Sequence, residues 1–334
     1  MSQHRSENGS WEPVERKVQL AGNSTFVVSL PKEWALAQEL ESGMSMHLYP
    51  HEDRVVASAE TIPDQDRSAT VDAAAVDDET VLRRVRSAYV VGRDRITIVG
   101  ADGLGQEARR ALDRVVGRLV GVEIVEDAGE RIVVQDLLDV DDVSLPQTLV
   151  QARQLALEMH ADALEALVRD DEELARRVID RDDEVDRLFA FVSRGFHCGL
   201  EDVHEINRLG TDRASAFRDY RIARQLERVA DHAERIATVA VAQSGPPADG
   251  IGDSIETVGA DARRPLELAL TEEGDRADDA IEDALVAIEE LDRRLSESDD
   301  PDAYRYGTVL ESLRRTGAIA GNVLEVTSES RIGP

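Results

Sequence analysis

Several residue types are scarce in this chain of 334 residues, which has one cysteine and is only 4% aromatic. The single cysteine, Cys198, excludes an internal disulfide and a zinc site built from several thiolates, and it fits a reducing compartment. No apolar run approaches the roughly 18 residues of a membrane span, and the N-terminus has no signal-peptide character. We therefore expect a cytoplasmic protein without a membrane-inserted segment.

Lysine is also scarce, although the chain is highly charged. There are 69 acidic residues against 39 basic ones, for a net charge of -30, and Lys17 and Lys32 are the only lysines. One explanation is an acidic partner surface or a nucleic-acid mimic. The other is adaptation to high salt, in which hydrated carboxylates keep a protein soluble while salt screens their charge. Arginine in place of lysine favours the second, so we expect a halophilic protein whose acidity says little about its partners.

Changes of pattern divide the chain into five segments. Residues 13–58 read as short strands around a short helix, and residues 59–78 as an acidic, aperiodic linker. A small α/β domain is expected over 79–140, followed by two successive sets of three helices over 144–243 and 253–330. The predicted fold is therefore multidomain, with a small β domain, a small α/β domain and an all-α region of two three-helix bundles.

Residues 18–57 carry an ordered set of features: a turn at Gly22-Asn23-Ser24, the segment Leu30-Pro31-Lys32-Glu33-Trp34, and a closing hairpin. This set resembles the AbrB/MazE/SpoVT family of swapped-hairpin proteins. The resemblance implies that two chains interleave into a small DNA-binding β-barrel, so a homodimer and a DNA partner are expected. Independently of it, so small a unit cannot close a core alone.

Both lysines of the chain lie in or beside this segment. Their retention there suggests phosphate contacts at Lys17 and Lys32, with Arg16 and Arg54 as supporting charges. However, acidic residues outnumber basic ones in the same stretch, and DNA affinity falls steeply with salt. A pure dimerisation role for the segment is the alternative.

Two acidic stretches, Asp182-Asp-Glu-Val-Asp186 and residues 226–237, resemble the motifs of the PhoU family of phosphate-uptake regulators. The resemblance implies a site for metal ions, iron or another divalent cation, with four candidate ligands: Asp182, Asp186, Glu227 and Asp231. Residues four apart on a helix project from one face, so two such helices side by side offer four oxygens to a cation.

The spacing itself is weak support, because random placement of 69 acids gives roughly 14 such pairs. Asp182, however, falls on the apolar seam of its helix, and a partly buried carboxylate requires a partner. That partner is either a metal ion or an arginine, for which Arg224 and Arg228 are candidates. The second set of helices is degenerate, since its matching positions are Leu285, Glu289, Arg314 and Ala318. If a metal ion is bound, it is therefore expected in the first bundle and not in the second.

The chain has no nucleophile elbow, phosphate loop or paired histidine motif, so we expect no enzymatic activity. His160, His197, His204 and His232 lack ligand spacing and are predicted to be surface or hydrogen-bonded side chains. Together the two resemblances imply a DNA-binding transcriptional regulator of phosphate uptake, with a helical domain that senses phosphate status through metal or partner contact. The alternative is an adaptor that contacts a phosphate transporter ATPase or a kinase, with the hairpin as a dimer clamp. An antitoxin-like role is a third and weaker interpretation.

Overall fold

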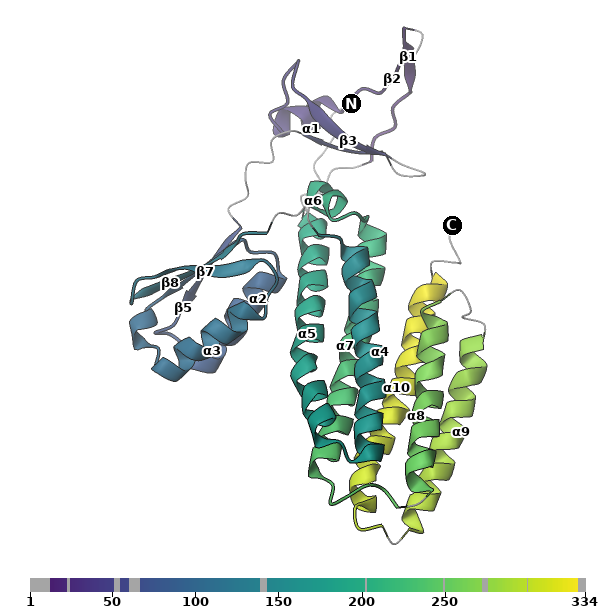
Figure 1. Ribbon diagram of the computed structural model, residues 1–334. Helices are drawn as coiled ribbons and strands as arrows, with labels where there is room; N and C mark the ends of the chain where they lie inside the picture. The colour runs from purple at the N-terminus through teal and green to yellow at the C-terminus, as the bar shows by residue number, and fades with distance from the viewer. Residues whose placement is uncertain are drawn as a thin grey trace. The chain divides into compact units, whose positions relative to one another are not determined.

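The computed structural model divides the chain into two compact units, Met1–Asp66 and Arg67–Pro334 (Figure 1). Ten α-helices lie in the described part of the chain, which confirms the prediction of a mostly helical protein. The described residues are 13–22, 25–50, 55–59, 67–138, 143–201, 203–248, 250–271, 276–298 and 300–329.

The N-terminal unit contains two antiparallel hairpins and one short helix. Strands β1 (Gln19–Ala21) and β2 (Thr25–Val27) pair so that Leu20 faces Phe26. Strands β3 (Met46–Pro50) and β4 (Val55–Ala59) form the second hairpin, and α1 (Lys32–Ala37) lies between the two in sequence. Pro31 at the N-cap of α1 suits a helix start, because a proline there gives up no intrahelical hydrogen bond.

This unit has no core of its own in its described residues. None of the side chains described between residues 13 and 59 is buried, and Phe26 is 73% exposed. Its exposed apolar side chains include Val18, Leu20, Phe26, Leu36, Leu48 and Val55. An apolar surface of this kind is typical of a unit completed by a partner, and the interleaved dimer stays our prediction for it.

The α/β domain is a four-stranded sheet with helices α2 (Asp78–Val90) and α3 (Gln106–Gly117) packed against it (Figure 1). The strand order is β5-β6-β8-β7, and only the β5–β6 pair is parallel. The strands are β5 (Ser68–Asp72), β6 (Arg95–Val99), β7 (Val122–Asp127) and β8 (Arg131–Asp136). A short 3-10 helix, η1 (Ala101–Gly103), follows β6.

The prediction of an acidic linker over 59–78 is wrong for the second half of that range, because Ser68–Asp72 form the strand β5. This strand pairs in parallel with β6, and its Val71 is buried in the core of the domain. Asp77 then caps α2, its carboxylate accepting a 2.8 Å hydrogen bond from the Thr80 backbone N–H. With one fully buried side chain among five, the strand shows too little alternation to stand out in the sequence.

The first set of helices contains α4 (Leu145–Arg169), α5 (Glu172–Glu201) and α7 (Arg213–Ala242), with the short α6 (Val203–Arg208) between α5 and α7. The second set contains α8 (Ile251–Ala269), α9 (Ala277–Ser296) and α10 (Ala303–Glu329). Short α6 was not predicted. No described helix has a stretch long and apolar enough to cross a lipid bilayer.

The two sets of helices share one continuous core. Helix α4 packs on α8 and α7 packs on α10, and buried residues of all six long helices belong to a single cluster (Figure 1). At Gly259 of α8, an added Cβ would lie 2.3 Å from a methyl carbon of Leu164 of α4, so the two helices approach very closely there. The two three-helix sets predicted from the sequence are therefore halves of one body.

Candidate functional site

The predicted DNA contacts lie on exposed positions of the N-terminal unit. Arg16 and Lys17 precede β1, and Lys32 is the first residue of α1; all three are exposed. Arg54 lies outside the described residues. Contact of these side chains with DNA stays a prediction.

The four predicted metal ligands lie on two neighbouring helices, Asp182 and Asp186 on α5, Glu227 and Asp231 on α7. Burial, followed by the charges of Glu234, Asp186 and Asp231, raises the pKa of Asp182 to about 7. Burial and then the charges of Asp231 and Asp186 also raise the pKa of Glu227. The structure thus brings the four carboxylates within electrostatic reach of one another.

Two further acids, Asp183 and Glu234, belong to the same cluster and were missed by the sequence reasoning. Glu234 exerts the largest charge effect on Asp182, and burial followed by Asp231 raises its own pKa. Glu234 lies three residues beyond Asp231 and so projects from the same side of α7. A search for spacings of four residues alone overlooks it.

Arginines of the α/β domain neutralise part of this cluster. Arg86 of α2 donates to Asp186 at 2.9 Å, and Arg118, just after α3, forms an ion pair with Asp183. The candidates named from the sequence, Arg224 and Arg228, act on Glu227 only through weaker charge effects. The counter-charges therefore come largely from a different domain.

Carboxylates are suitable donors for iron or another divalent cation. In the described part of the chain, however, no three His, Cys, Asp or Glu side chains converge as a metal site would require. Arg86 and Arg118 hold Asp186 and Asp183 in ion pairs instead. Two carboxylates of the cluster are thus ion-paired, and cation binding stays a prediction from the sequence.

Two histidines contradict the expectation that they are surface or hydrogen-bonded groups. His160 of α4 and His232 of α7 are buried, and within the described residues both ring nitrogens of His160 and Nδ1 of His232 have no hydrogen-bond partner. Burial lowers the pKa of His160 to about 3 and that of His232 to about 4. His197 agrees with the expectation, since its Nδ1 lies 2.7 Å from the Ser193 carbonyl oxygen. The His204 side chain lies outside the described part.

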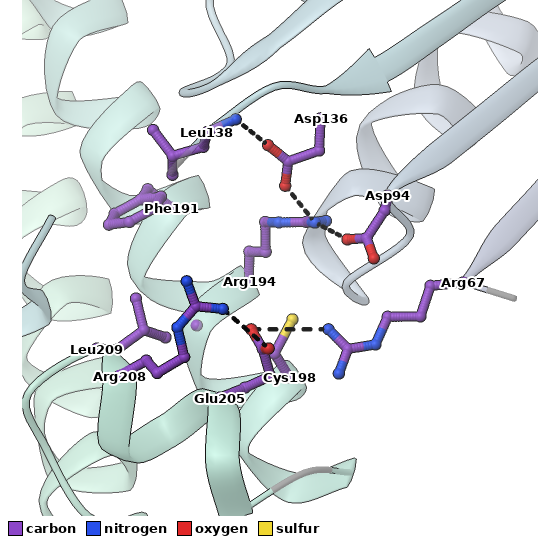
Figure 2. Close-up of a pocket in the computed structure, with 11 residues that line it drawn as sticks. Arg67, Asp94, Asp136, Leu138, Phe191, Arg194, Cys198, Glu205, Arg208 and Leu209 are labelled. Carbon is purple, nitrogen blue, oxygen red and sulfur yellow. Dashed lines mark hydrogen bonds and ion pairs between the residues drawn. The ribbon is translucent and has the colours of Figure 1, made fainter. Parts of the chain in front are cut away.

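Arg194 of α5 fixes the α/β domain to the helical region (Figure 2). It is only 6% exposed, and it donates to the carbonyl oxygens of Tyr89 and Arg93 at 2.9 and 3.0 Å. It also donates to the carboxylates of Asp94 and Asp136 at 2.5 and 2.6 Å. Buried, charge-assisted bonds of this kind are strong and directional. Arg194 was not singled out from the sequence, where the available signal is an arginine within the mostly apolar stretch 189–196.

Close packing supports the same junction. Gly92, which ends the turn after α2, has a φ of +84°, a conformation that glycine adopts without strain. A Cβ added there would lie 2.6 Å from the Sγ atom of Cys198 on α5. The backbone of the α/β domain therefore touches α5 with no space for a side chain.

Aromatic side chains of α5 and α7 contact one another, with Phe196 and Tyr220 partly buried and Phe217 exposed. Phe196 stacks on Tyr220 with ring centres 5.1 Å apart, and Phe217 lies 5.6 Å from Phe196. Phe217 is 47% exposed, and Arg221 lies over its ring at 5.7 Å. The stretch 213–228 of α7 contains five arginines and two acids in a chain of net charge -30. We call this surface the aromatic–arginine face; it comprises Phe196, Phe217, Tyr220, Arg221, Arg224 and Arg228.

Comparison with known proteins assigns part of this helical region. The family model described as PhoU domain matches residues 149–240, which run from α4 through α7. No curated protein gives a significant match to the chain.

Two solved structures resemble the chain at low identity. The phosphate transport system regulatory protein PhoU from Streptococcus pneumoniae is 19% identical and has a TM-score of 0.43, with 57% of this chain and 94% of that chain covered. PhoU from Pseudomonas aeruginosa is 20% identical with a TM-score of 0.37, and 55% and 93% are covered. What the comparisons show for this chain is the match of residues 149–240 to the PhoU domain model.

Proposed function

We propose that this protein regulates phosphate uptake by contacting a partner protein. The observation that carries the proposal is the match of residues 149–240 to the PhoU domain. The predicted absence of catalytic motifs fits a regulator, whose effect depends on binding.

The aromatic–arginine face is the surface we assign to this contact. Aromatic residues and arginine are enriched at protein interfaces and often supply most of the binding energy. Positive charge on a chain this acidic favours an acidic segment of the partner.

DNA binding by the N-terminal unit is a second candidate function. Lys17 and Lys32 are the only lysines of the chain and both are exposed in that unit, as phosphate contacts require. The two functions are compatible, since they use different parts of the chain.

Phosphate uptake in cells that lack the gene tests the proposal. We expect deletion to change uptake during growth on ample phosphate, and the parent chain to restore it. The double variant Phe217→Ala/Arg224→Glu should not restore regulation, whereas Arg110→Glu, an equal charge change on exposed α3, should. Full restoration by the double variant rules out the assigned surface, and unchanged uptake on deletion rules out the function. Failure of Lys17→Glu/Lys32→Glu alone would favour the DNA candidate.

A further inference from the structure

We propose that the outer edge of β5 binds the same edge of a second copy of this chain, so that two four-stranded sheets join into one. Strands β5 and β7 are the two edges of the sheet, whose order is β5-β6-β8-β7. An edge strand presents backbone N–H and C=O groups that can pair with another strand. The contact is distinct from the one predicted for the N-terminal unit, and it concerns assembly, which lies beyond the proposed function.

The hydrogen bonds to β6 identify which backbone groups of β5 point outwards. The Arg67 carbonyl oxygen, just before β5, and the Ala73 N–H, just after it, both bond to β6. Backbone groups alternate in direction along a strand, so the odd-numbered residues of β5 also face β6. The even-numbered residues, Ser68, Thr70 and Asp72, face away from it. Among the described residues, no hydrogen bond reaches the backbone groups of these three.

The two edges of the sheet differ in how they are protected. Strand β7 has three acidic residues among six, Glu123, Glu126 and Asp127, and its pairing with β8 shifts register before Glu126. Charges and bulges of this kind keep an edge strand from pairing with another strand. Strand β5 has no charged residue from Ser68 to Val71 and no proline, and it pairs with β6 over all five residues without a shift. The β5 edge is therefore the one suited to strand addition.

The occupant that fits this edge is a second copy in antiparallel orientation. Centred on Thr70, this pairing places Thr70 opposite Thr70 of the second copy, and Ser68 opposite Asp72 of the second copy. The outward backbone groups then meet partners, and the Ser68 hydroxyl can donate to the Asp72 carboxylate. A parallel pairing in register would instead set Asp72 beside Asp72, and like charges that face each other are destabilising. A two-fold axis relates the antiparallel pair, so the contact closes at two copies.

The helical region leaves this edge accessible. It meets the sheet at the end where β6 begins and β8 ends, through the bonds of Arg194 to Asp94 and Asp136. The side chains of the three outward residues of β5 are exposed. Two copies can therefore approach along β5, with their helical regions at opposite ends of the joined sheet.

Cysteine cross-linking of the full-length chain tests the contact. Opposite residues of a hydrogen-bonded antiparallel pair have Cα atoms about 5.5 Å apart, within the roughly 4.4–6.8 Å that a disulfide spans. Thr70→Cys should therefore form a covalent dimer under mild oxidation about tenfold faster, or more, than Glu123→Cys does. Glu123 is an exposed residue of the opposite edge strand and serves as the matched control. The native Cys198 is buried, and the parent chain, oxidised in parallel, measures its background.

Two further variants report on the hydrogen bonds of the joined sheet. The Thr70 N–H points away from β6, so Thr70→Pro keeps the bonds between β5 and β6 and removes one to the second copy. We expect the Asp72 amide to exchange about tenfold faster in Thr70→Pro than in the parent. The Val71 amide, which faces β6, should be unchanged. Thr70→Lys, which sets two like charges opposite each other, should also speed the exchange of Asp72.

Each outcome decides the proposal. Faster cross-linking of Thr70→Cys, together with protection of the Asp72 amide in the parent, supports the joined sheet. Equal rates of cross-linking at residues 70 and 123 overturn it, as does equal exchange of Asp72 in the parent, Thr70→Pro and Thr70→Lys. Protection of Asp72 without a cross-link means that another segment covers the edge, and it also overturns the proposal. None of these results tests phosphate regulation, which is measured separately in cells.

Discussion

Arg86 of α2 and Asp186 of α5 are 100 positions apart in the chain, yet a 2.9 Å hydrogen bond joins their side chains. The pair links the α/β domain to the acid cluster of α5 and α7. Both side chains are partly exposed, so the pair contributes about 0.2–1 kcal/mol to stability.

Arg86→Ala should lower the unfolding midpoint slightly, and Arg86→Ala/Arg118→Ala should lower it further. Thermal unfolding with Arg110→Ala as control measures this, and midpoints equal to the control would contradict it.

Asp182→Asn should stabilise the protein above neutral pH. The folded state holds the Asp182 proton up to a pKa of about 7, against 3.8 for an unperturbed aspartate. The free energy of unfolding therefore falls as the pH rises from about 4 to 7, because ionising Asp182 costs more in the folded protein than in the unfolded chain. The variant removes this cost, and we expect a gain of about 1–2 kcal/mol at pH 8 after allowing for solvent screening. Denaturant unfolding of the parent and of Asp182→Asn at pH 4 and pH 8 checks this gain. At pH 4 the two proteins should be equally stable.

The metal hypothesis makes a separate prediction for Asp231→Asn. If Asp182, Asp186, Glu227 and Asp231 hold a divalent cation, then iron or manganese should raise the unfolding midpoint of the parent, and the variant should lose that gain. Chelator should remove the difference. Glu289→Gln on α9, at the matching position of the second helix set, is the control and should behave as the parent. Identical midpoints with cation and with chelator would leave the cluster as an ion-pair network.

His160 should make the protein sensitive to acid. The folded state keeps this side chain neutral down to a pKa of about 3, whereas an unperturbed histidine takes up a proton near pH 6.5. As the pH falls below 6.5 the unfolded state therefore binds more protons, and stability declines progressively towards pH 3. His160→Leu, which also removes two unpartnered nitrogens, should lose less stability between pH 7 and pH 5. His47→Leu on exposed β3 is the control, and an equal loss in parent and His160→Leu would argue against this assignment.

Gly92→Ala should loosen the docking of the α/β domain. The new Cβ would meet Cys198 Sγ at 2.6 Å, and the backbone has a φ of +84°. Overpacking and the left-handed conformation together cost about 1–3 kcal/mol. Gly103→Ala is a matched control in the same domain, since nothing lies within 4 Å of its added Cβ. Hydrogen exchange of β6 and α5, compared between the two variants, reports the effect.

Features that depend on local periodicity, such as the helices and the side chains that share a helix face, could be predicted from the sequence. Asp182 and Asp186 share a face because they are four apart on one helix, and apolar seams set α5 beside α7. The sequence did not predict Arg86 as the partner of Asp186, because that contact depends on how a separate domain packs on α5. His160 was placed wrongly for a similar reason: helix α8 covers a second side of α4, and the pattern of one helix does not reveal which of its faces a distant helix will cover.

The length of α5 has a mechanical consequence. Its 30 residues make a rod of about 45 Å, and Asp186, Arg194 and Phe196 all lie within a span of about 15 Å along it. An α-helix transmits displacement along its axis with little internal give. A partner bound at Phe196 would therefore act on the same short stretch of α5 to which Arg194 and Asp186 attach the α/β domain.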